Sequence, residues 1–147
     1  MRKNLLTAML VFVCLFLVAC DPPNYYHPEI DSEISSIELI EYQENDVQSG
    51  REIQPFCFEK VVVLKEFDKT KTDELLTVIK DIYLIQYFTH PNRPSGKCFK
   101  INFDDGTFEI MSENRLVVHY GEDGTVLDYI GVVDDTSALL ELIGSYD

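Results

Sequence analysis

Acidic and aliphatic residues alternate in the first part of the chain that has a regular pattern. Residues 36–42 (SIELIEY) follow this period of two, which predicts a β-strand with one wet face. Residues 58–67 contain the β-branched run VVVL, and such a run favours a strand that is buried on much of both faces. Residues 43–56 are polar and contain a glycine and a proline, so we expect a loop there.

The spacing of apolar residues becomes helical after residue 67. Residues 70–74 (TKTDE) offer an N-cap and first-turn acids, which suit the positive end of a helix dipole. The apolar stripe that follows consists of Leu75, Leu76, Ile79, Ile82 and Tyr83. We expect a short strand at 84–88 and a loop at 89–96, because two prolines and a glycine interrupt any regular element.

Two Asp-Gly dipeptides predict two β-hairpins in the C-terminal half. A type I′ turn needs positive φ at both central positions, and Asp-Gly is one of the pairs that favour it. Pairing around the first dipeptide, residues 105–106, sets Phe103 opposite Phe108. The same register sets Ile101 opposite Ile110, so we expect both pairs on one face of the sheet.

The second dipeptide, residues 123–124, repeats the signal. Pairing around it sets Tyr120 opposite Leu127. It also sets Val118 opposite Tyr129. The two hairpins together predict a four-strand antiparallel meander over roughly residues 98–131.

A short apolar helix at residues 136–143 completes the pattern, and Gly144 stops it. The expected order along the chain is β-β-α-β-β-β-β-β-α. We therefore expect an α+β fold, in which a twisted antiparallel sheet carries two helices packed on one face.

The N-terminus has the pattern of an export signal. Arg2 and Lys3 precede an uncharged apolar run over residues 5–19. That run is at the upper edge of a signal-peptide core and short of the roughly 20 residues that span a bilayer. The small residue Ala19 and the turn-forming DPP after Cys20 argue against the alternative, a transmembrane anchor.

Residues 17–20 (LVAC) resemble the lipobox of bacterial lipoproteins. The resemblance implies a diacylglyceryl group on Cys20 and cleavage before it. Two acyl chains hold a protein firmly, whereas one binds only reversibly. We therefore expect an exported protein, lipid-anchored to the cell membrane and facing the extracytoplasmic side.

Three segments follow from this pattern. Residues 1–19 form the lipoprotein signal peptide, residues 20–34 the lipidated cysteine and a flexible tether, and residues 35–147 a single domain. Tyr25 and Tyr26 in the tether have two interpretations that the sequence does not separate. They sit at the membrane interface, or they form a strand that adds to the domain.

The chain is strongly acidic. Its 26 Asp and Glu residues against 12 Lys and Arg residues give a net charge of −14. Removal of the signal peptide takes away Arg2 and Lys3 and no acid, which leaves −16. Such a surface repels nucleic acid and anionic lipid headgroups, so we exclude nucleic acid as a partner. It favours a basic partner protein or cations, although solubility alone also explains it.

Cys57 and Cys98 are the two cysteines outside the signal peptide and lipobox. An exported domain permits a disulfide between them. The alternative is a pair of free, buried thiols that act as small apolar side chains. The sequence does not decide between the two.

No catalytic or cofactor motif is recognisable, and we expect a protein that is not an enzyme. His119 and Asp128 become cross-strand neighbours in the second hairpin, and a His-Asp pair orients a general base in some enzymes. No nucleophile accompanies them in the sequence, so a stabilising surface pair is the better interpretation. The spacing of histidines, cysteines and acids predicts no metal site and no cofactor.

Residues 94–110 and the helix near the C-terminus are similar to those of small uncharacterised bacterial lipoproteins. The similarity extends over roughly residues 58–147 and rests on the hairpin pattern. It implies the fold and the location and carries no site.

These observations favour a membrane-anchored, non-catalytic binding or interaction module. We expect loops 43–56 and 89–97 to contact the partner. Arg93, Lys97 and Lys100 give the second loop local positive charge within an acidic protein. The alternative function is an inhibitor or immunity protein that neutralises a basic toxin or hydrolase, since negative charge speeds association with a cationic target.

Overall fold

The computed structural model describes residues 25–26, 30, 33–43, 53–85 and 93–146. Its elements are β1 (Tyr25–Tyr26), β2 (Ile34–Tyr42), the 3-10 turn η1 (Phe58–Lys60), β3 (Val61–Glu66), α2 (Lys69–Lys80), β4 (Leu84–Ile85), β5 (Gly96–Phe103), β6 (Phe108–Ser112), β7 (Leu116–Tyr120), β8 (Val126–Val133) and α3 (Thr136–Gly144).

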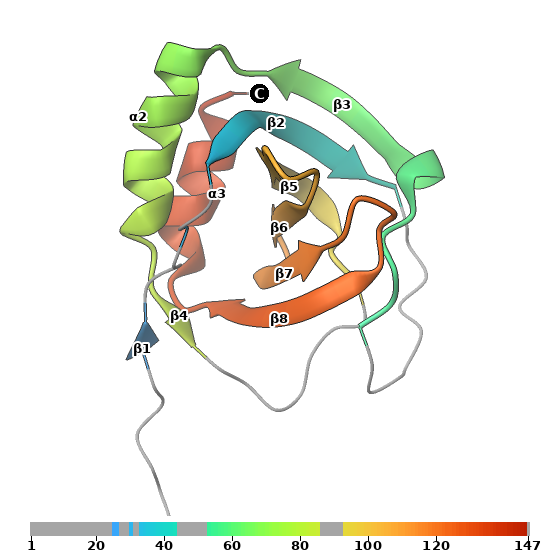
Figure 1. The fold of residues 1–147 in the computed structure, drawn as a ribbon. Helices are drawn as coiled ribbons and strands as arrows, with labels where there is room; N and C mark the ends of the chain where they lie inside the picture. The colour runs from blue at the N-terminus through green and yellow to red at the C-terminus, as the bar shows by residue number, and fades with distance from the viewer. Residues whose placement is uncertain (1–24, 27–29, 31–32, 44–52, 86–92, 147) are drawn as a thin grey trace, which may run out of the picture.

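One antiparallel sheet contains all the strands of the described residues, in the order β1-β4-β8-β7-β6-β5-β2-β3. Figure 1 shows the sheet curving strongly, with α2 and α3 side by side next to it. The sheet does not close, because β1 and β3 remain at its two edges. The predicted α+β fold is confirmed, and after β1 the strands and helices follow in the predicted order.

The pairing of β1 supports one of the two interpretations of Tyr25 and Tyr26, the additional strand. Tyr25 pairs with Ile85 and Tyr26 with Leu84, so these residues add a short strand to the sheet. The pairing fixes a point of the chain that comes soon after Cys20.

Apolar side chains cover both faces of the sheet. On one face, which we call the helix-side core, the buried residues of α2 and α3 pack against those of β2, β5 and β6. Its fully buried members include Leu75, Ile79, Leu139, Ile37, Leu39, Phe99, Ile101 and Met111. This double coverage explains why every residue of β6 is buried instead of every second one.

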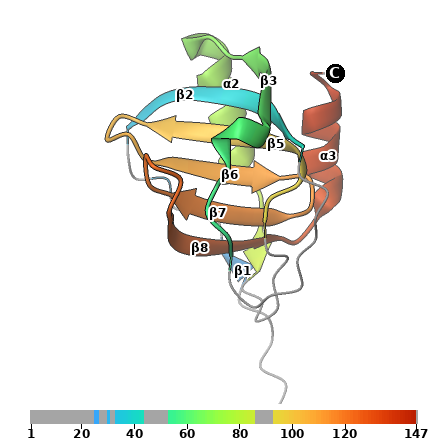
Figure 2. The ribbon, with the colours of Figure 1, turned by 90° about the vertical axis from the view of Figure 1, so that its right-hand side faces the viewer.

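The opposite face carries a second core, which we call the aromatic core. It contains Tyr42, Phe56, Cys98, Phe108 and Tyr120, together with aliphatic residues of β2, β6 and β7. Figure 2 shows residues 53–57 crossing this face of the sheet, on the side away from α2. The Phe56 amide donates to the Gly124 carbonyl at 2.8 Å, which ties the crossing segment to the β7–β8 loop.

An aspartate caps the N-terminus of each of the two helices. Asp68 caps α2 by accepting a hydrogen bond from the Lys71 amide at 2.9 Å, so the helix starts slightly before the TKTDE segment from which we predicted it. Asp135 caps α3 in the same way through the Ser137 amide at 2.8 Å. Gly144 is the last residue of α3, and it does not adopt the left-handed conformation of a glycine cap.

The prediction that the VVVL run forms a strand buried on both faces is wrong. Among the described residues β3 is an edge strand that pairs with β2 alone, and its residues from Val62 to Glu66 are exposed. A β-branched run favours the extended backbone, but burial depends on which neighbours the topology supplies. At the end of the sheet, the described part of the chain supplies one neighbouring strand.

The predicted register of the first hairpin is wrong by one residue. Asn102, not Phe103, lies opposite Phe108, and Lys100 lies opposite Ile110. The loop consists of three residues, 104–106, and of these only Gly106 has a positive φ (86°). A two-residue type I′ turn needs two consecutive residues with positive φ. A shift of one residue reverses the faces. Phe103 therefore belongs to the helix-side core and Phe108 to the aromatic core.

The second hairpin confirms one predicted pair and corrects the other. Val118 lies opposite Tyr129, as predicted, but Tyr120 lies opposite Val126 rather than Leu127. The register shifts between His119 and Tyr120 account for the difference. Gly124 has a positive φ of 81° at the third loop position, so this loop repeats the geometry of the first.

Candidate functional site

β3 carries a run of three consecutive exposed apolar residues at one edge of the described sheet, next to the exposed Phe58 of η1. We call this surface the β3 edge and define it as Phe58, Val62, Val63 and Leu64. Their exposed fractions are 46%, 41%, 49% and 43%. Since β3 is the last strand, its outward backbone groups face no other strand of the described residues. An open edge of this kind is a template for pairing with another chain.

A β-bulge shapes this edge. Leu39 pairs with Lys65 and Ile40 with Val63, so Leu64 is an extra residue on β3. A bulge leaves its extra residue unpaired and increases the local twist of the strand. The bulge therefore limits regular pairing along the outer side to the segment that precedes Leu64.

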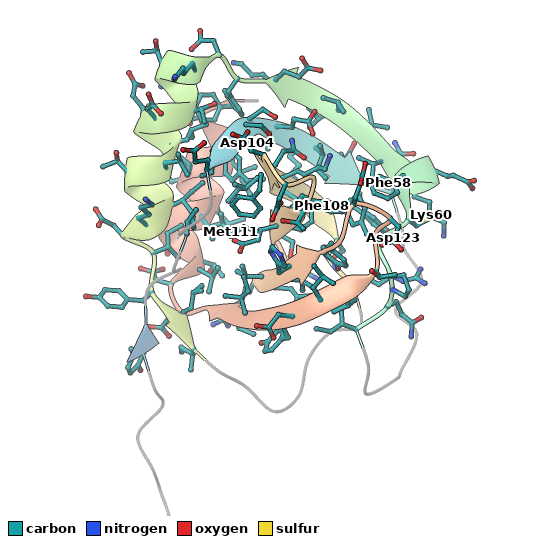
Figure 3. The ribbon with its side chains drawn as sticks, viewed as in Figure 1. Phe58, Lys60, Asp104, Phe108, Met111 and Asp123 are labelled. Carbon is teal, nitrogen blue, oxygen red and sulfur yellow. The ribbon has the colours of Figure 1, made fainter. Side chains whose placement is uncertain are left out.

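The turn at the start of β3 is anchored by an aromatic side chain. The Phe58 ring lies 5.2 Å from that of Phe56 and 5.7 Å from that of Phe108, both with edge-to-face geometry. Phe58 is still nearly half exposed. Figure 3 shows Phe58 and Lys60 at the end of β3 that lies farthest from α2. A held, half-exposed aromatic ring is a typical anchor in protein interfaces.

Charged groups flank the edge without covering it. The Lys65 ammonium lies 5.7 Å from the Phe67 ring centre and 5.0 Å from that of Tyr146, toward the end of α3. Glu66 lies opposite Glu38 on β2. The Glu38 carboxylate is 3.3 Å from the Lys100 ammonium, which compensates its charge.

The three cations predicted to mark a partner-binding loop lie in two different environments. The structure places Lys97 and Lys100 in β5, not in a loop. The Lys100 ammonium, in addition to its ion pair with Glu38, lies 5.0 Å from the centre of the Phe108 ring. Arg93 is half-buried, and its carbonyl accepts a hydrogen bond from Asn114 at 2.9 Å. Residues 44–52 of the first predicted contact loop and residues 89–92 of the second lie outside the described residues.

Both cysteines of the domain are free thiols in the structure, which corresponds to the alternative without a disulfide. Cys98 is fully buried, and its Sγ lies 3.4 Å from the Gly96 carbonyl oxygen. Burial raises the pKa of the Cys98 thiol far above its ordinary value, so it stays protonated. Cys57 is half-buried, and its amide donates to the Tyr42 hydroxyl at 3.0 Å. Cys20, the predicted lipidation site, lies outside the described residues.

The predicted His-Asp pair is confirmed as a cross-strand pair, because His119 lies opposite Asp128. The closer partner of His119 is Glu109 on β6, whose Oε1 is 3.4 Å from Nδ1 of the histidine. Glu109 is only 6% exposed, and burial raises its pKa to about 7. The sequence analysis assigned pairs only within the two Asp-Gly hairpins, whereas this contact joins β6 to β7, for which no register was predicted.

Glu109, His119 and Asp128 lie side by side across β6, β7 and β8. No nucleophile lies next to them on β5 or β6. Cys98 and Ser112 lie opposite each other in the sheet, on the face of the aromatic core. Glu109 alternates with its neighbours Phe108 and Ile110 and therefore faces the helix side. Within the described residues no three His, Cys, Asp or Glu side chains come close enough together to hold a metal ion.

Comparison of the chain with family models, curated proteins and solved structures gives no match. Of the two helices in the described part of the chain, neither is long and apolar enough to cross a membrane.

Proposed function

We propose that this chain is a lipid-anchored extracytoplasmic protein whose domain binds an extended segment of a basic partner protein along the β3 edge. The observation that carries the proposal is the run Val62–Leu64, in which each of three consecutive apolar residues on an edge strand is more than two-fifths exposed. Exposed apolar groups that adjoin a free strand edge are typical of sites where a partner adds a strand.

The backbone supplies the affinity in this mode of binding. A partner segment that pairs with the outer side of β3 forms main-chain hydrogen bonds, and its alternate side chains contact the exposed valines. Phe58 at the end of the strand offers one larger apolar contact. The bulge at Leu64 limits the paired segment to a few residues.

The charge of the chain favours a basic partner over a second copy of itself. The net charge is −14, so two copies repel each other while a cationic protein is attracted. Electrostatic attraction of this kind raises the association rate and makes it sensitive to salt. In one form of this proposal the partner is a basic toxin or hydrolase. The chain neutralises it on binding and so acts as an inhibitor or immunity protein.

The position of β1 supports presentation of the β3 edge away from the membrane. Four residues separate Cys20 from Tyr25, and the five steps from one Cα to the next limit that stretch to about 18 Å. Because β1 and β3 are the two edges of the sheet, an anchor next to β1 leaves β3 on the opposite side of the domain (Figure 1). A partner in the extracytoplasmic space then reaches β3 without contacting the bilayer.

The anchor has a direct test. Cells that express the full chain are grown with radiolabelled palmitate, and the protein is recovered by immunoprecipitation. We expect label in the wild-type chain and none in Cys20→Ser, with Cys57→Ser as the matched control that keeps its label. Label that persists in Cys20→Ser would contradict lipidation at this residue.

Binding along β3 is tested with synthetic peptides and the full chain in mild detergent. The probe is a fluorescein-labelled peptide of sequence KKVTVTVKK, and fluorescence anisotropy gives its dissociation constant. We expect binding that weakens as salt is added, and at least about tenfold weaker binding of EEVTVTVEE. A version of the basic peptide in which consecutive amides are all N-methylated has both of its edges blocked and cannot pair with a strand. Equal binding of the methylated peptide would mean that charge alone is responsible.

A further inference from the structure

A cavity of about 490 Å³ lies between α2 and the start of β2, and none of the residues that define the β3 edge lines it. This volume is within the range of ligand pockets. The lining residues come from α2, from the start of β2, from Ile30 before β2, from Phe67 before the cap of α2 and from Asp104 in the first hairpin loop.

The inner wall of the cavity is apolar. Ile30, Ile34, Phe67 and Leu76 line it, and all four also belong to the helix-side core or pack against it. The wall is therefore continuous with a rigid part of the protein. A preformed apolar wall suits a ligand that has an apolar body.

Thr72 places a polar group in this wall. The residue is 5% exposed, and its Oγ1 has no hydrogen-bond partner among the described residues. The Asp68 carbonyl, which a helical threonine hydroxyl often uses, accepts from the Thr72 amide at 2.8 Å. A buried hydroxyl without a partner is unfavourable. Because this oxygen is itself buried, a ligand in the cavity would contact the apolar wall and the charged rim rather than the hydroxyl.

The rim carries two charges of each sign. Lys69, Asp73 and Lys80 follow one another along α2, and Asp104 joins them from the β5–β6 loop. Figure 3 shows the Asp104 side chain directed toward α2. In the part of the chain that the structure describes, none of these four groups forms an ion pair. Their charges are therefore available to a ligand.

The order of these groups along α2 defines the ligand. Asp73 and Lys80 are seven residues apart, which is about 10 Å along the helix, and Leu76 lies between them. An extended chain of three amino acids also spans about 10 Å. We infer that this cavity binds a short zwitterionic peptide of two or three apolar residues. Its ammonium group lies near Asp73 and Asp104, its side chains lie against Leu76 and Phe67, and its carboxylate lies near Lys80.

Isothermal titration calorimetry of the full chain with trileucine tests the inference. We expect a saturable heat at micromolar to millimolar peptide. Blocking the amine by acetylation, or the carboxylate by amidation, should weaken binding at least about tenfold, since each removes one charge contact. Equal binding of the doubly blocked peptide would overturn the zwitterionic assignment. Binding of free leucine as tight as that of trileucine would overturn the peptide assignment, and absence of any heat would overturn the site.

Variants of the rim locate the binding. Asp73→Asn and Lys80→Gln are exposed changes that the fold tolerates, and each should weaken trileucine binding at least about tenfold. Glu141→Gln on α3 also removes one exposed carboxylate, so it is the matched control and should leave trileucine binding unchanged. Thr72→Val keeps the shape of the side chain and removes a buried hydroxyl that the ligand does not contact, so it should leave trileucine binding unchanged. Unchanged affinity in both rim variants would contradict this site.

The proposal does not depend on the β3 edge. A variant of β3 should leave trileucine binding intact, and the rim variants should leave capture of the basic strand peptide intact. Failure of one prediction is therefore distinguishable from failure of the other.

Discussion

Glu109 on β6 and His119 on β7 lie opposite each other in the sheet, with 3.4 Å between Oε1 of the carboxyl group and Nδ1 of the ring. Ile101, the residue opposite Glu109 on its other side, is apolar and fully buried. Burial therefore dominates, and it raises the Glu109 pKa from its ordinary 4.5 to about 7.

The raised pKa makes stability depend on pH. The folded state binds the Glu109 proton more tightly than the unfolded state, so the contribution of Glu109 is most favourable below about pH 4.5. It is lost as the pH rises through 7. The loss over this range is about 3 kcal/mol for a group so deeply buried. The aspartates whose pKa is lowered act in the opposite direction, so the effect of Glu109 must be isolated by a variant.

Glu109→Gln should remove this loss. We expect the variant to exceed wild type in free energy of unfolding by about 1–3 kcal/mol at pH 8 and to differ little near pH 4.5. Urea denaturation at a series of pH values measures the difference. Glu141→Gln, an exposed change on α3, should show no such pH dependence. A difference between Glu109→Gln and wild type that stays constant with pH would contradict the raised pKa.

Arg115 occupies a backbone conformation that usually requires glycine. It has φ of 79° at the third position of the β6–β7 loop, where the other two hairpin loops have Gly106 and Gly124. Its Nε donates to the Val133 carbonyl at 2.8 Å and its Nη2 to the Asp134 carbonyl at 3.1 Å. These hydrogen bonds offset a left-handed strain of about 1–2 kcal/mol.

Arg115→Ala should therefore lower the free energy of unfolding by about 1–3 kcal/mol, because it keeps the strain and loses both hydrogen bonds. Arg115→Gly loses the same bonds but relieves the strain, so it should be less destabilising than alanine. Chemical denaturation of the two variants decides the point. Equal losses for alanine and glycine would show that the backbone strain is not significant.

The two glycine loops provide a matched pair of substitutions. A Cβ added at Gly124 would lie 2.7 Å from the Phe56 carbonyl oxygen and 3.0 Å from Phe58, whereas one at Gly106 meets nothing closer than 3.5 Å. Both positions share the positive φ. Gly106→Ala should therefore cost about 1 kcal/mol, and Gly124→Ala at least about 1 kcal/mol more. Thermal unfolding compares them, and equal costs would mean that the segment at Phe56 moves away freely.

The order of elements could be predicted from the sequence because apolar spacing reports local periodicity. Residues 70–83 gave α2, and the Asp-Gly dipeptides gave the two hairpins at nearly the correct positions. The register of the paired strands could not be predicted as accurately as the order of the elements. Whether Gly106 ends a two-residue or a three-residue loop depends on the φ of its neighbours, which the dipeptide does not specify. That single residue decides which face Glu109 occupies.

The β3 edge and the cavity beside α2 depend on the three-dimensional arrangement of the elements even more strongly than the register does. Nothing in the VVVL run indicates that β3 has β2 as its only neighbour. The cavity combines α2 with Asp104, two elements that are distant in the sequence. In contrast, the lipobox is a local motif and needs no fold to be recognised.

Binding of the basic strand peptide by two charge-matched variants tests the central claim most directly. Val63→Lys places a charge in the centre of the β3 edge, and Leu127→Lys places the same charge on β8, at an apolar residue that is 55% exposed. We predict that Val63→Lys weakens binding of KKVTVTVKK at least about tenfold, while Leu127→Lys binds it like wild type. Equal affinities of the two variants would contradict binding along β3.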